Sequence, residues 1–281
     1  MPPVPFILIA DDFGLSHGVS DAILDLLAKN RLSGTGSMVN QPVWASRADD
    51  LRPFQGHRDL GLHLTLTLGA PLGPAPTLAP EGHFLPLSRL MAKCFSNALP
   101  RREIRDEIIR QITAFRDRTG RFPDFIDGHQ HVHVLPVIRH ALFDALEILN
   151  PPYKPWLRVP SDHMGSIMAR GVSVGKALFI AFLSLGFTRK AKRAGYRVND
   201  TFSGVRSFDP EVDFASEFQR FLLVQGRHHL VMCHPGVSDE SLAALDPVTT
   251  ARDQEYEFFK SDAFEAMLQA YSLRIARFDD V

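Results

Sequence analysis

Cysteine, net charge and long apolar runs are all scarce in this 281-residue sequence. Its two cysteines, Cys94 and Cys233, are too few for a disulfide framework, so we expect a reducing compartment, the cytoplasm. Lys and Arg number 31 against 32 Asp and Glu, and this balance excludes an electrostatic case for nucleic acid as the main partner. The longest apolar stretch, 177–187, is shorter than the roughly 20 residues that a bilayer span requires. The N-terminus lacks the charged start of a signal peptide and is expected to form a buried strand.

Apolar residues make up 45% of the chain, and their spacing alternates between strand and helix patterns. The expected strands are 6–10, 37–40, 60–66, 125–132, 156–159, 229–233 and 273–278. The expected helices are 16–30, 100–120, 137–149, 166–193, 214–224 and 255–270. This alternation predicts parallel β-α units, and no repeat or linker divides the chain. We therefore expect one TIM-like α/β barrel domain over residues 1–281, with a helical insertion at about 160–200 and chemistry at the carboxyl ends of the strands.

Histidine is the residue type that stands out. Of 12 histidines, three lie close together as His129, His131 and His133, two residues after Asp127. In an extended strand all four side chains would point to one face, and burying them together is costly without a metal or a dense hydrogen-bond network. Residues on one face of a strand lie too far apart for all three imidazoles to bind one ion. We expect one ligand, with the other two beside it or facing substrate; a purely structural cluster is the alternative.

Two carboxylates, Asp11 and Asp12, follow the first expected strand. Neighbouring side chains in a strand diverge, so one is expected to bind a metal and the other to accept a proton from water. The alternative is an acidic helix N-terminus. His63 shares a face with Thr65 and Thr67, and by itself it fits a hydrogen-bonded core residue as well as a ligand.

His234 ends an apolar strand, where an imidazole is suited to general acid catalysis. A nucleophilic pair with Cys233 is disfavoured, because adjacent strand residues face opposite sides. Arg158 fits either an ion pair with a catalytic Asp or a surface ion pair. Residues 177–187 are apolar and precede a basic run, so segment 177–193 fits a membrane-surface or lipid-contacting element, or else a core or dimer helix.

Taken in order, these motifs resemble the YdjC-like carbohydrate deacetylases, which include chitooligosaccharide deacetylases and a hopanoid-biosynthesis-associated branch. The matching segments are Ala10-Asp11-Asp12-Phe13-Gly14-Leu15, Ser37-Met38-Val39-Asn40, Gly61-Leu62-His63-Leu64, Asp127-Gly128-His129-Gln130-His131-Val132-His133 and Met232-Cys233-His234-Pro235-Gly236. The apolar-then-basic segment within 160–200 looks more like the hopanoid-associated branch.

This resemblance implies a distorted β/α barrel of the glycoside hydrolase/deacetylase type and a divalent metal, Mg or Zn. It assigns the metal to Asp12, His63 and His129. It also implies that Asp11 is the catalytic base and that His234 is the general acid. The residues expected beside these groups or facing the substrate are Asp127, His131, His133, Arg158 and Asn40.

The expected reaction is removal of an acetyl group from an N-acetylated amino sugar, in an oligosaccharide or a lipid-linked glycoside, with release of acetate. Three other functions stay open at this point: a two-metal phosphoesterase, a glycosidase that uses Asp11 and Asp12, and a non-catalytic sugar- or lipid-binding protein with a structural metal. A homodimer is also an open expectation.

Overall fold

Strands and helices alternate along the chain in the computed structural model, which describes residues 2–281. The strands are β1 (Val4–Phe13), β2 (Gly34–Ser37), β3 (Asp59–Leu64), β4 (Phe125–Gly128), β5 (Trp156–Leu157), β6 (Thr201–Ser203), β7 (His229–Cys233) and β8 (Leu273–Ile275). The α-helices are α1 (His17–Ala28), α2 (Trp44–Arg47), α3 (Leu87–Phe95), α4 (Arg101–Thr119), α5 (Ile138–Leu149), α6 (Met164–Arg170), α7 (Val174–Arg193), α8 (Phe214–Phe221), α9 (Glu240–Leu245), α10 (Thr250–Lys260) and α11 (Asp262–Ala270). Short 3₁₀ helices are η1 (Ala48–Phe54), η2 (His129–Val134) and η3 (Phe278–Asp280).

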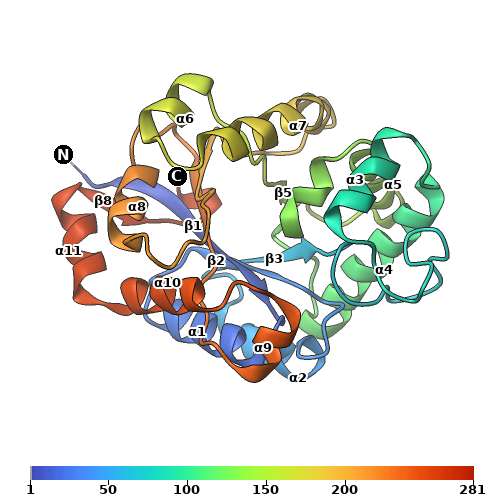
Figure 1. Cartoon of the computed structure of the whole chain (residues 1–281), viewed down its shortest axis with the longest axis horizontal. Helices are drawn as coiled ribbons and strands as arrows, with labels where there is room; N and C mark the ends of the chain where they lie inside the picture. Colours follow the sequence, from blue (N-terminus) through green and yellow to red (C-terminus); the bar gives the residue numbers. More distant parts are fainter. Residues whose placement is uncertain (1) are drawn as a thin grey trace.

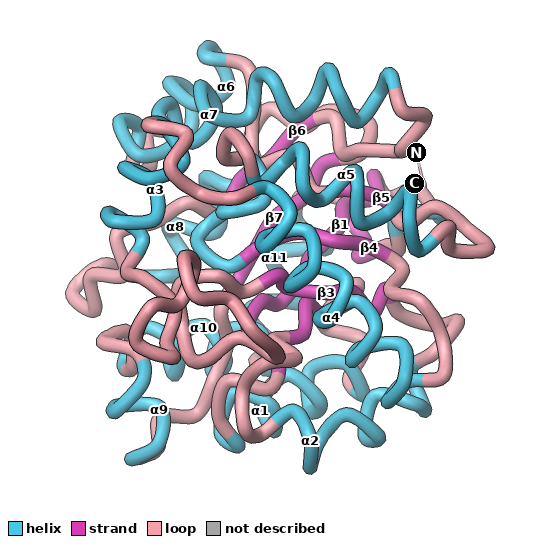
Figure 2. The backbone as a smooth tube through the Cα atoms, turned by 90° about the vertical axis from the view of Figure 1, so that its right-hand side faces the viewer, coloured by secondary structure: helices cyan, strands magenta, loops and turns pink. Residues whose placement is uncertain are grey.

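The strands form one parallel sheet that helices surround (Figures 1 and 2). Its order is β5-β4-β3-β2-β1-β7-β6, and β8 pairs with the start of β1. A parallel bridge between Leu157 and Val198 joins β5 to the segment that leads into β6. Because one bridge, rather than a ladder of pairs, joins the two ends of the sheet, the barrel is distorted. The expected α/β fold is confirmed.

Strand β1 shows why the sheet is covered on both sides. Its residues Phe6, Ile7, Leu8 and Ile9 are all fully buried, as expected of a parallel strand between two apolar layers. Ile7 and Ile9 belong to a cluster inside the sheet with Phe125, whereas Phe6 and Leu8 belong to the larger core that includes helix residues. The two-residue period of the strand therefore divides its side chains between the barrel interior and the helical layer.

The helices expected at 16–30 and 100–120 are confirmed as α1 and α4. The Ser16 hydroxyl accepts a hydrogen bond from Val19 N at the start of α1. Helix α4 ends at Gly120, whose φ of 79° suits the left-handed conformation of a helix terminus. No helix within residues 2–281 combines the length and apolar character that crossing a membrane requires.

Four expected elements differ from the structure. The strand expected at 37–40 lies earlier, as β2, and the strand expected at 125–132 ends at Gly128. The helix expected at 255–270 is two helices, because the Ser261 hydroxyl accepts from Phe264 N and starts α11 anew. The helix expected at 166–193 is likewise divided into α6 and α7, at Gly171 with a φ of 65°.

Candidate active site

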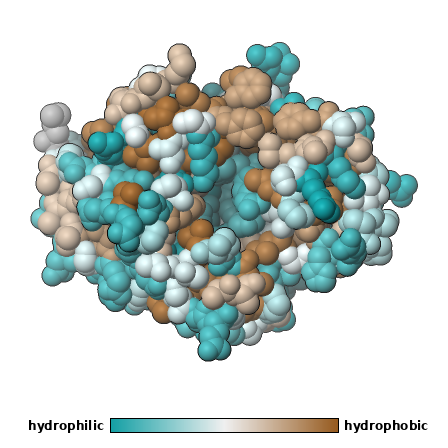
Figure 3. All heavy atoms as spheres, viewed as in Figure 1, coloured by the Kyte–Doolittle hydropathy of each residue, from teal (hydrophilic) through white to brown (hydrophobic). Residues whose placement is uncertain are grey.

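A cavity of about 470 Å³ opens where the strands end, and the predicted site residues gather in it. Figure 3 shows a hollow in this face with hydrophilic atoms inside it, and in Figure 1 helices α3, α7 and α10 lie around the same region. Six of the predicted site residues line the cavity: Asp11, Asp12, His63, His129, His131 and His234. Chemistry at the carboxyl ends of parallel strands is the usual arrangement in β/α barrels.

An irregularity in β1 brings both carboxylates to this cavity. The register between β1 and β2 shifts between Ala10 and Phe13, and Asp12 has a φ of 72°. In a regular strand the side chains of Asp11 and Asp12 would point to opposite sides. A left-handed non-glycine residue costs about 1–3 kcal/mol and persists where the surrounding contacts hold it. Here the strained residue delivers two acids to one site.

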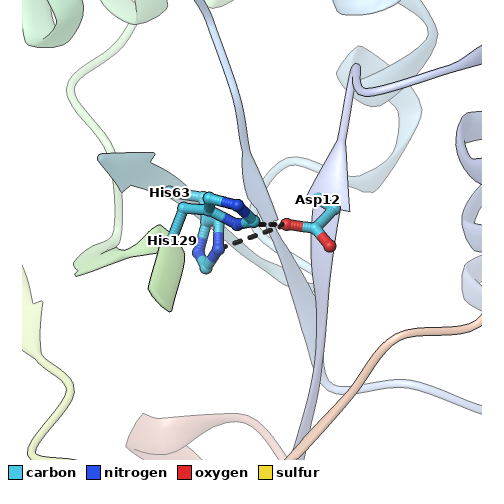
Figure 4. Close-up of side chains that lie close together, drawn as sticks. All are labelled: Asp12, His63 and His129. Atoms are coloured by element: carbon cyan, nitrogen blue, oxygen red, sulfur yellow. Dashed lines mark hydrogen bonds and ion pairs between the residues drawn. The ribbon is translucent and has the colours of Figure 1, made fainter. Parts of the chain in front are cut away.

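Asp12, His63 and His129 form a group whose ligand atoms lie within 4.8 Å of one another (Figure 4). The Asp12 Oδ1 atom is 3.3 Å from His63 Nε2 and 3.2 Å from His129 Nδ1. One carboxylate and two imidazoles are a donor set that binds zinc and other divalent ions, with positions left for water and substrate. These three residues are therefore suited to hold a metal.

Asp127 orients the His63 imidazole. His63 Nδ1 lies 2.7 Å from Asp127 Oδ1, which favours the tautomer with the proton on Nδ1 and a free lone pair on Nε2. A side chain at Gly36 would come within 3.2 Å of His63 Cβ and 3.4 Å of the same Asp127 oxygen. Glycine at this point of β2 therefore leaves room for the pair.

The predicted strand over 125–132 is wrong, and so is its consequence that four side chains share one face. The chain turns into η2 after Gly128, with Gln130 and His131 at φ values of 53° and 58°. His129 consequently faces Asp12, while His131 lies edge-on to Phe202 with ring centres 5.8 Å apart. The turn separates the three imidazoles into different environments.

His133 turns away from the metal group. It is fully buried, its Nε2 lies 2.9 Å from the Arg158 carbonyl oxygen, and its ring meets Phe187 edge-on. Burial lowers its pKa to about 4, so the ring is neutral near pH 7. It supports the segment that carries Arg158.

Arg158 is buried and not at the surface, and it holds two carboxylates. Its guanidinium donates to Asp11 Oδ1 and Oδ2 at 2.6 and 2.7 Å, and it lies 2.7 Å from Asp127 Oδ2. A second group of metal-ligand type, Asp11 with His63 and Asp127, shares these carboxylates. Because the guanidinium already balances them, a second metal ion there would meet a fixed positive charge.

His234 also lies near Asp11, the carboxylate that Arg158 holds. Its Nε2 is 3.8 Å from Asp11 Oδ2, and its backbone N–H donates to Glu255 at 2.5 Å. The ring meets Phe208 edge-on, with centres 5.0 Å apart. Burial lowers its pKa well below the usual value, so the free site holds this imidazole neutral.

The two adjacent acids have opposite electrostatic environments. Burial raises the pKa of Asp11, although the charge of Arg158 opposes it. Burial acts in the same direction on Asp12, but the charge of Arg252 and hydrogen bonds to His129 and His63 outweigh it and hold that pKa well below the usual value. Asp12 therefore stays ionised, as a metal ligand must.

Charge counting shows that the site favours a cation. Four carboxylates, Asp11, Asp12, Asp127 and Asp246, contact two guanidinium groups, those of Arg158 and Arg252. Burial lowers the pKa of His63, but the charges of Asp127 and Asp11 outweigh it and raise that pKa to about 10. The site thus attracts further positive charge, and a divalent ion on the imidazole nitrogens would replace the His63 proton.

Sequence reasoning missed Arg252, which lies in α10. It is 2% exposed, and its Nη2 is 2.6 Å from both Asp12 Oδ2 and Asp246 Oδ2. The residue stands outside every motif, and no local pattern marks it, because its partner Asp12 lies 240 positions earlier.

Asn40, expected beside the site or facing substrate, instead donates to the carbonyl oxygens of Leu68 and Ala70. It supports the loop after β3 and is not among the cavity-lining residues.

The chain is similar to proteins named as carbohydrate deacetylases. The carbohydrate deacetylase of Mus musculus is 32% identical over 151 residues, 52% of this chain and 48% of that protein. The chain thus spans about half the length of that relative. The carbohydrate deacetylase of Halalkalibacterium halodurans is 27% identical over 258 residues, 89% of this chain and 93% of that protein.

A solved structure shares the fold over its whole length. It is a protein of Enterococcus faecalis named for cellobiose-phosphate cleavage, with a TM-score of 0.74, 22% identity, and coverage of 99% of this chain and 98% of that one. At this level of sequence identity, the structural similarity is evidence for the fold alone. The family model for YdjC-like proteins matches residues 5–270, nearly the whole chain. The protein belongs to the YdjC-like family.

Proposed function

We propose that this protein is a metal-dependent carbohydrate deacetylase that hydrolyses the acetamide of an N-acetylated amino sugar. Water and the amide would give acetate and a free amine. The observation that carries the proposal is the convergence of a metal-ligand group, a buried carboxylate and a histidine in one cavity. Relatives of this chain named as carbohydrate deacetylases support the same reaction.

Asp12, His63 and His129 would hold the ion. When bound there, the ion supplies Lewis acidity, which polarises the acyl carbonyl and makes water more acidic. Two imidazoles in the donor set favour Zn²⁺ over Mg²⁺, because Mg²⁺ prefers oxygen ligands. Arg252 holds the second oxygen of Asp12 and keeps the first directed toward both imidazoles.

Asp11 would accept the proton of the attacking water. Arg158 grips both of its oxygens, which fixes the carboxylate while leaving it at the cavity wall. As the water oxygen bonds to the acyl carbon, the proton passes to Asp11. In this proposal Asp11 is the base and Asp12 is not, because Asp12 belongs to the metal-ligand group with His63 and His129.

His234 would return that proton to the departing nitrogen. It is neutral in the free site and lies 3.8 Å from Asp11. Neutral imidazole accepts the proton from Asp11 and then donates it to the amine as the carbon–nitrogen bond breaks. The same proton is thus taken from water and delivered to the leaving group.

The walls of the cavity fit a neutral sugar better than a charged phosphate ester. Apolar side chains, among them Met91, Leu183 and Phe208, line it beside the polar groups and suit the faces of pyranose rings. A two-metal phosphoesterase site is disfavoured because Arg158 balances the second carboxylate group. A glycosidase is disfavoured because Asp11 and Asp12 are adjacent and each is paired to a buried arginine.

Acetate release tests the proposal. We would assay N-acetylated chito-oligosaccharides and a lipid-linked N-acetylglucosamine, each with and without chelator and after Zn²⁺ or Mg²⁺ is added back. We expect acetate from at least one substrate, loss of activity with chelator, and recovery with Zn²⁺. Acetate release that chelator leaves unchanged would contradict the metal, and activity on neither substrate would contradict the deacetylase assignment.

Several finer expectations stay predictions: a single domain over residues 1–281, a cytoplasmic location and a homodimer. Two buried free thiols, Cys94 and Cys233, support a reducing compartment. Whether the sugar is part of an oligosaccharide or linked to a lipid is decided by the two arms of the acetate assay.

A further inference from the structure

Helices α6 and α7 carry an exposed apolar surface beside the cavity. Five large side chains on these helices are at least half exposed: Met164 69%, Met168 59%, Phe179 50%, Phe182 68% and Leu185 64%. Helical spacing places Phe179, Phe182 and Leu185 along one side of α7. We call these five residues the α6–α7 face. Figure 3 shows hydrophobic atoms gathered over both helices at the top of the molecule.

The same side of α7 becomes basic toward its end, where Arg189 and Lys192 are exposed. Beside it, a groove of about 810 Å³ runs between α5 and α7. Its charged lining is five cations against two carboxylates: Arg139, Lys154, Arg189, Lys190 and Arg193 against Asp144 and Glu147. Among the ion pairs of residues 2–281, none involves Arg139, Arg189, Lys190, Lys192 or Arg193.

This positive excess is local, because the whole chain has a net charge of −1. Exposed apolar side chains next to unpaired cations are the composition of an element that lies on an anionic membrane surface. The apolar side chains enter the region of the acyl chains and headgroups, while the cations remain at the level of the lipid phosphates. The two halves of α7 are arranged in this order along its length.

The α6–α7 face continues into the active-site cavity. Phe179 belongs to both, and its neighbours Ile180 and Leu183 line the cavity wall. A surface bound to this face would therefore lie next to the opening of the site. The position of the face, and not only its composition, connects it with function.

We propose that the α6–α7 face docks this protein on an anionic lipid bilayer, with the basic end of α7 contacting the headgroups. A second copy of the chain suits the face less well. In a symmetric contact the same patch meets itself, and the unpaired cations would gain no acidic partners. Docking is a binding property, so it is tested separately from the proposed deacetylase activity.

Vesicle sedimentation of the full chain tests the proposal. The vesicles are phosphatidylcholine alone, and phosphatidylcholine mixed with phosphatidylglycerol. We expect the wild type to bind the anionic vesicles at least about tenfold more strongly, with the difference reduced by salt. Two double variants separate the contributions: Phe182→Glu with Leu185→Glu for the apolar part, and Arg189→Gln with Arg193→Gln for the charged part.

The apolar variant is expected to lose at least about tenfold in binding to anionic vesicles, and the charge variant to lose the preference for them. The control is Val4→Glu, an apolar-to-Glu change at a half-exposed residue where β1 begins, at the end of the strand opposite Asp11 and Asp12. It should bind like the wild type. Circular dichroism melting establishes that each variant is folded.

Three results would overturn the proposal. The first is that the wild type stays in the supernatant with both vesicle types. The second is that the apolar variant is folded and sediments as the wild type does. The third is that light scattering shows a wild-type dimer and a monomeric apolar variant, which would assign the face to a second copy. None of these results bears on acetate release from a soluble sugar, so failure of docking and failure of the deacetylase assignment are distinguishable.

Discussion

The active-site cavity and the α6–α7 face both reverse the usual distribution of side chains, in opposite directions. The cavity buries charge: Asp11, Asp12 and Arg158 are each at most 2% exposed. The face exposes large apolar side chains, with Phe182 68% exposed. In the cavity the chain itself balances most of the buried charge, by pairing carboxylates with guanidinium groups. On the α6–α7 face no side chain of the described residues covers the five exposed apolar residues.

The difference indicates what each region lacks. Four carboxylates against two guanidinium groups leave the cavity short of positive charge, which an ion can provide. The face lacks an apolar partner and anions for its neighbouring cations, which only another surface can provide. Departures from the ordinary partition of polar and apolar groups are expected at functional sites.

The largest effect should come from removing a metal-ligand residue from the cavity. His129→Ala removes one of two imidazoles near Asp12, so we expect loss of bound metal. Activity should fall by more than the roughly 10³-fold that one oxyanion-stabilising donor contributes. Metal content by plasma mass spectrometry and acetate release check both. A variant that keeps a full equivalent of metal would contradict the ligand assignment.

Asp11→Asn separates the base from the ligands. The amide keeps the shape of the side chain but cannot take a proton, so we expect metal content to be retained and kcat to fall by about 10²–10⁴-fold. Arg158 loses a charged partner, and for this reason folding is checked by circular dichroism. Wild-type turnover in this variant would show that another group acts as base.

Two phenylalanines on α7 compare the buried and exposed sides of one helix. Phe187 is fully buried against His133 and Phe143, and Phe187→Ala should lower the free energy of unfolding by about 3–5 kcal/mol. Phe182→Ala should change it by no more than about 0.5 kcal/mol, because the side chain already contacts solvent. Urea unfolding measures both. Similar losses would mean that Phe182 supports the fold, and the α6–α7 face would then need another explanation.

A substitution of Arg252 tests whether the ion pair between Arg252 and Asp12 increases the affinity of the site for metal. Arg252→Met keeps much of the side-chain volume but removes the donor to Asp12 and Asp246. Groups that orient metal ligands contribute about 10–100-fold to affinity, so we expect a loss of that size in a metal titration. Exposed Arg227→Met is the matched control and should leave the affinity unchanged.

The smallest effect concerns a buried histidine that serves the fold. His229 lies in β7 next to the hydroxyls of Thr201 and Ser203, and burial lowers its pKa from 6.5 to about 3. Because its pKa is lower in the folded state, its neutral form stabilises the fold above about pH 6.5, and that stability is lost as the pH falls toward 3.

Between pH 7 and pH 5, the wild type should therefore lose about 2 kcal/mol more unfolding free energy than His229→Asn. Urea unfolding at the two pH values measures the difference between the two proteins. The comparison uses the change with pH and not the absolute stability, so a general destabilisation by the substitution does not affect it. An equal pH dependence would mean that His229 is not held neutral in the folded state.

The strands and the chemistry were predictable from local patterns to different degrees. The continuous apolar run at the start of β1 identifies a buried parallel strand, because such strands are covered on both faces. The motifs around Asp11, His63 and His234 identify residues that the structure brings into one cavity. Both signals are carried by residues close together in sequence.

The course of the chain after Asp127 was not predictable in this way. The alternating histidines predict a strand, yet Gln130 and His131 adopt left-handed conformations and the strand ends at Gly128. Neither residue is a glycine that would mark such a turn. The contacts of His129 with Asp12, and of His133 with the Arg158 carbonyl, involve segments that lie far away in sequence.

By itself, the sequence determined an α/β chain of parallel units with acids and imidazoles at strand ends, and an α7 segment that is apolar and then basic. These properties follow from residue type and spacing, which local physical chemistry is sufficient to interpret. Only the tertiary structure decided how the turn after Gly128 brings His129 to Asp12, that Arg158 and Arg252 balance the two adjacent acids, and that α7 exposes its apolar side next to the cavity. Those outcomes depend on contacts between residues more than a hundred positions apart, or on which face of a helix packs against the barrel.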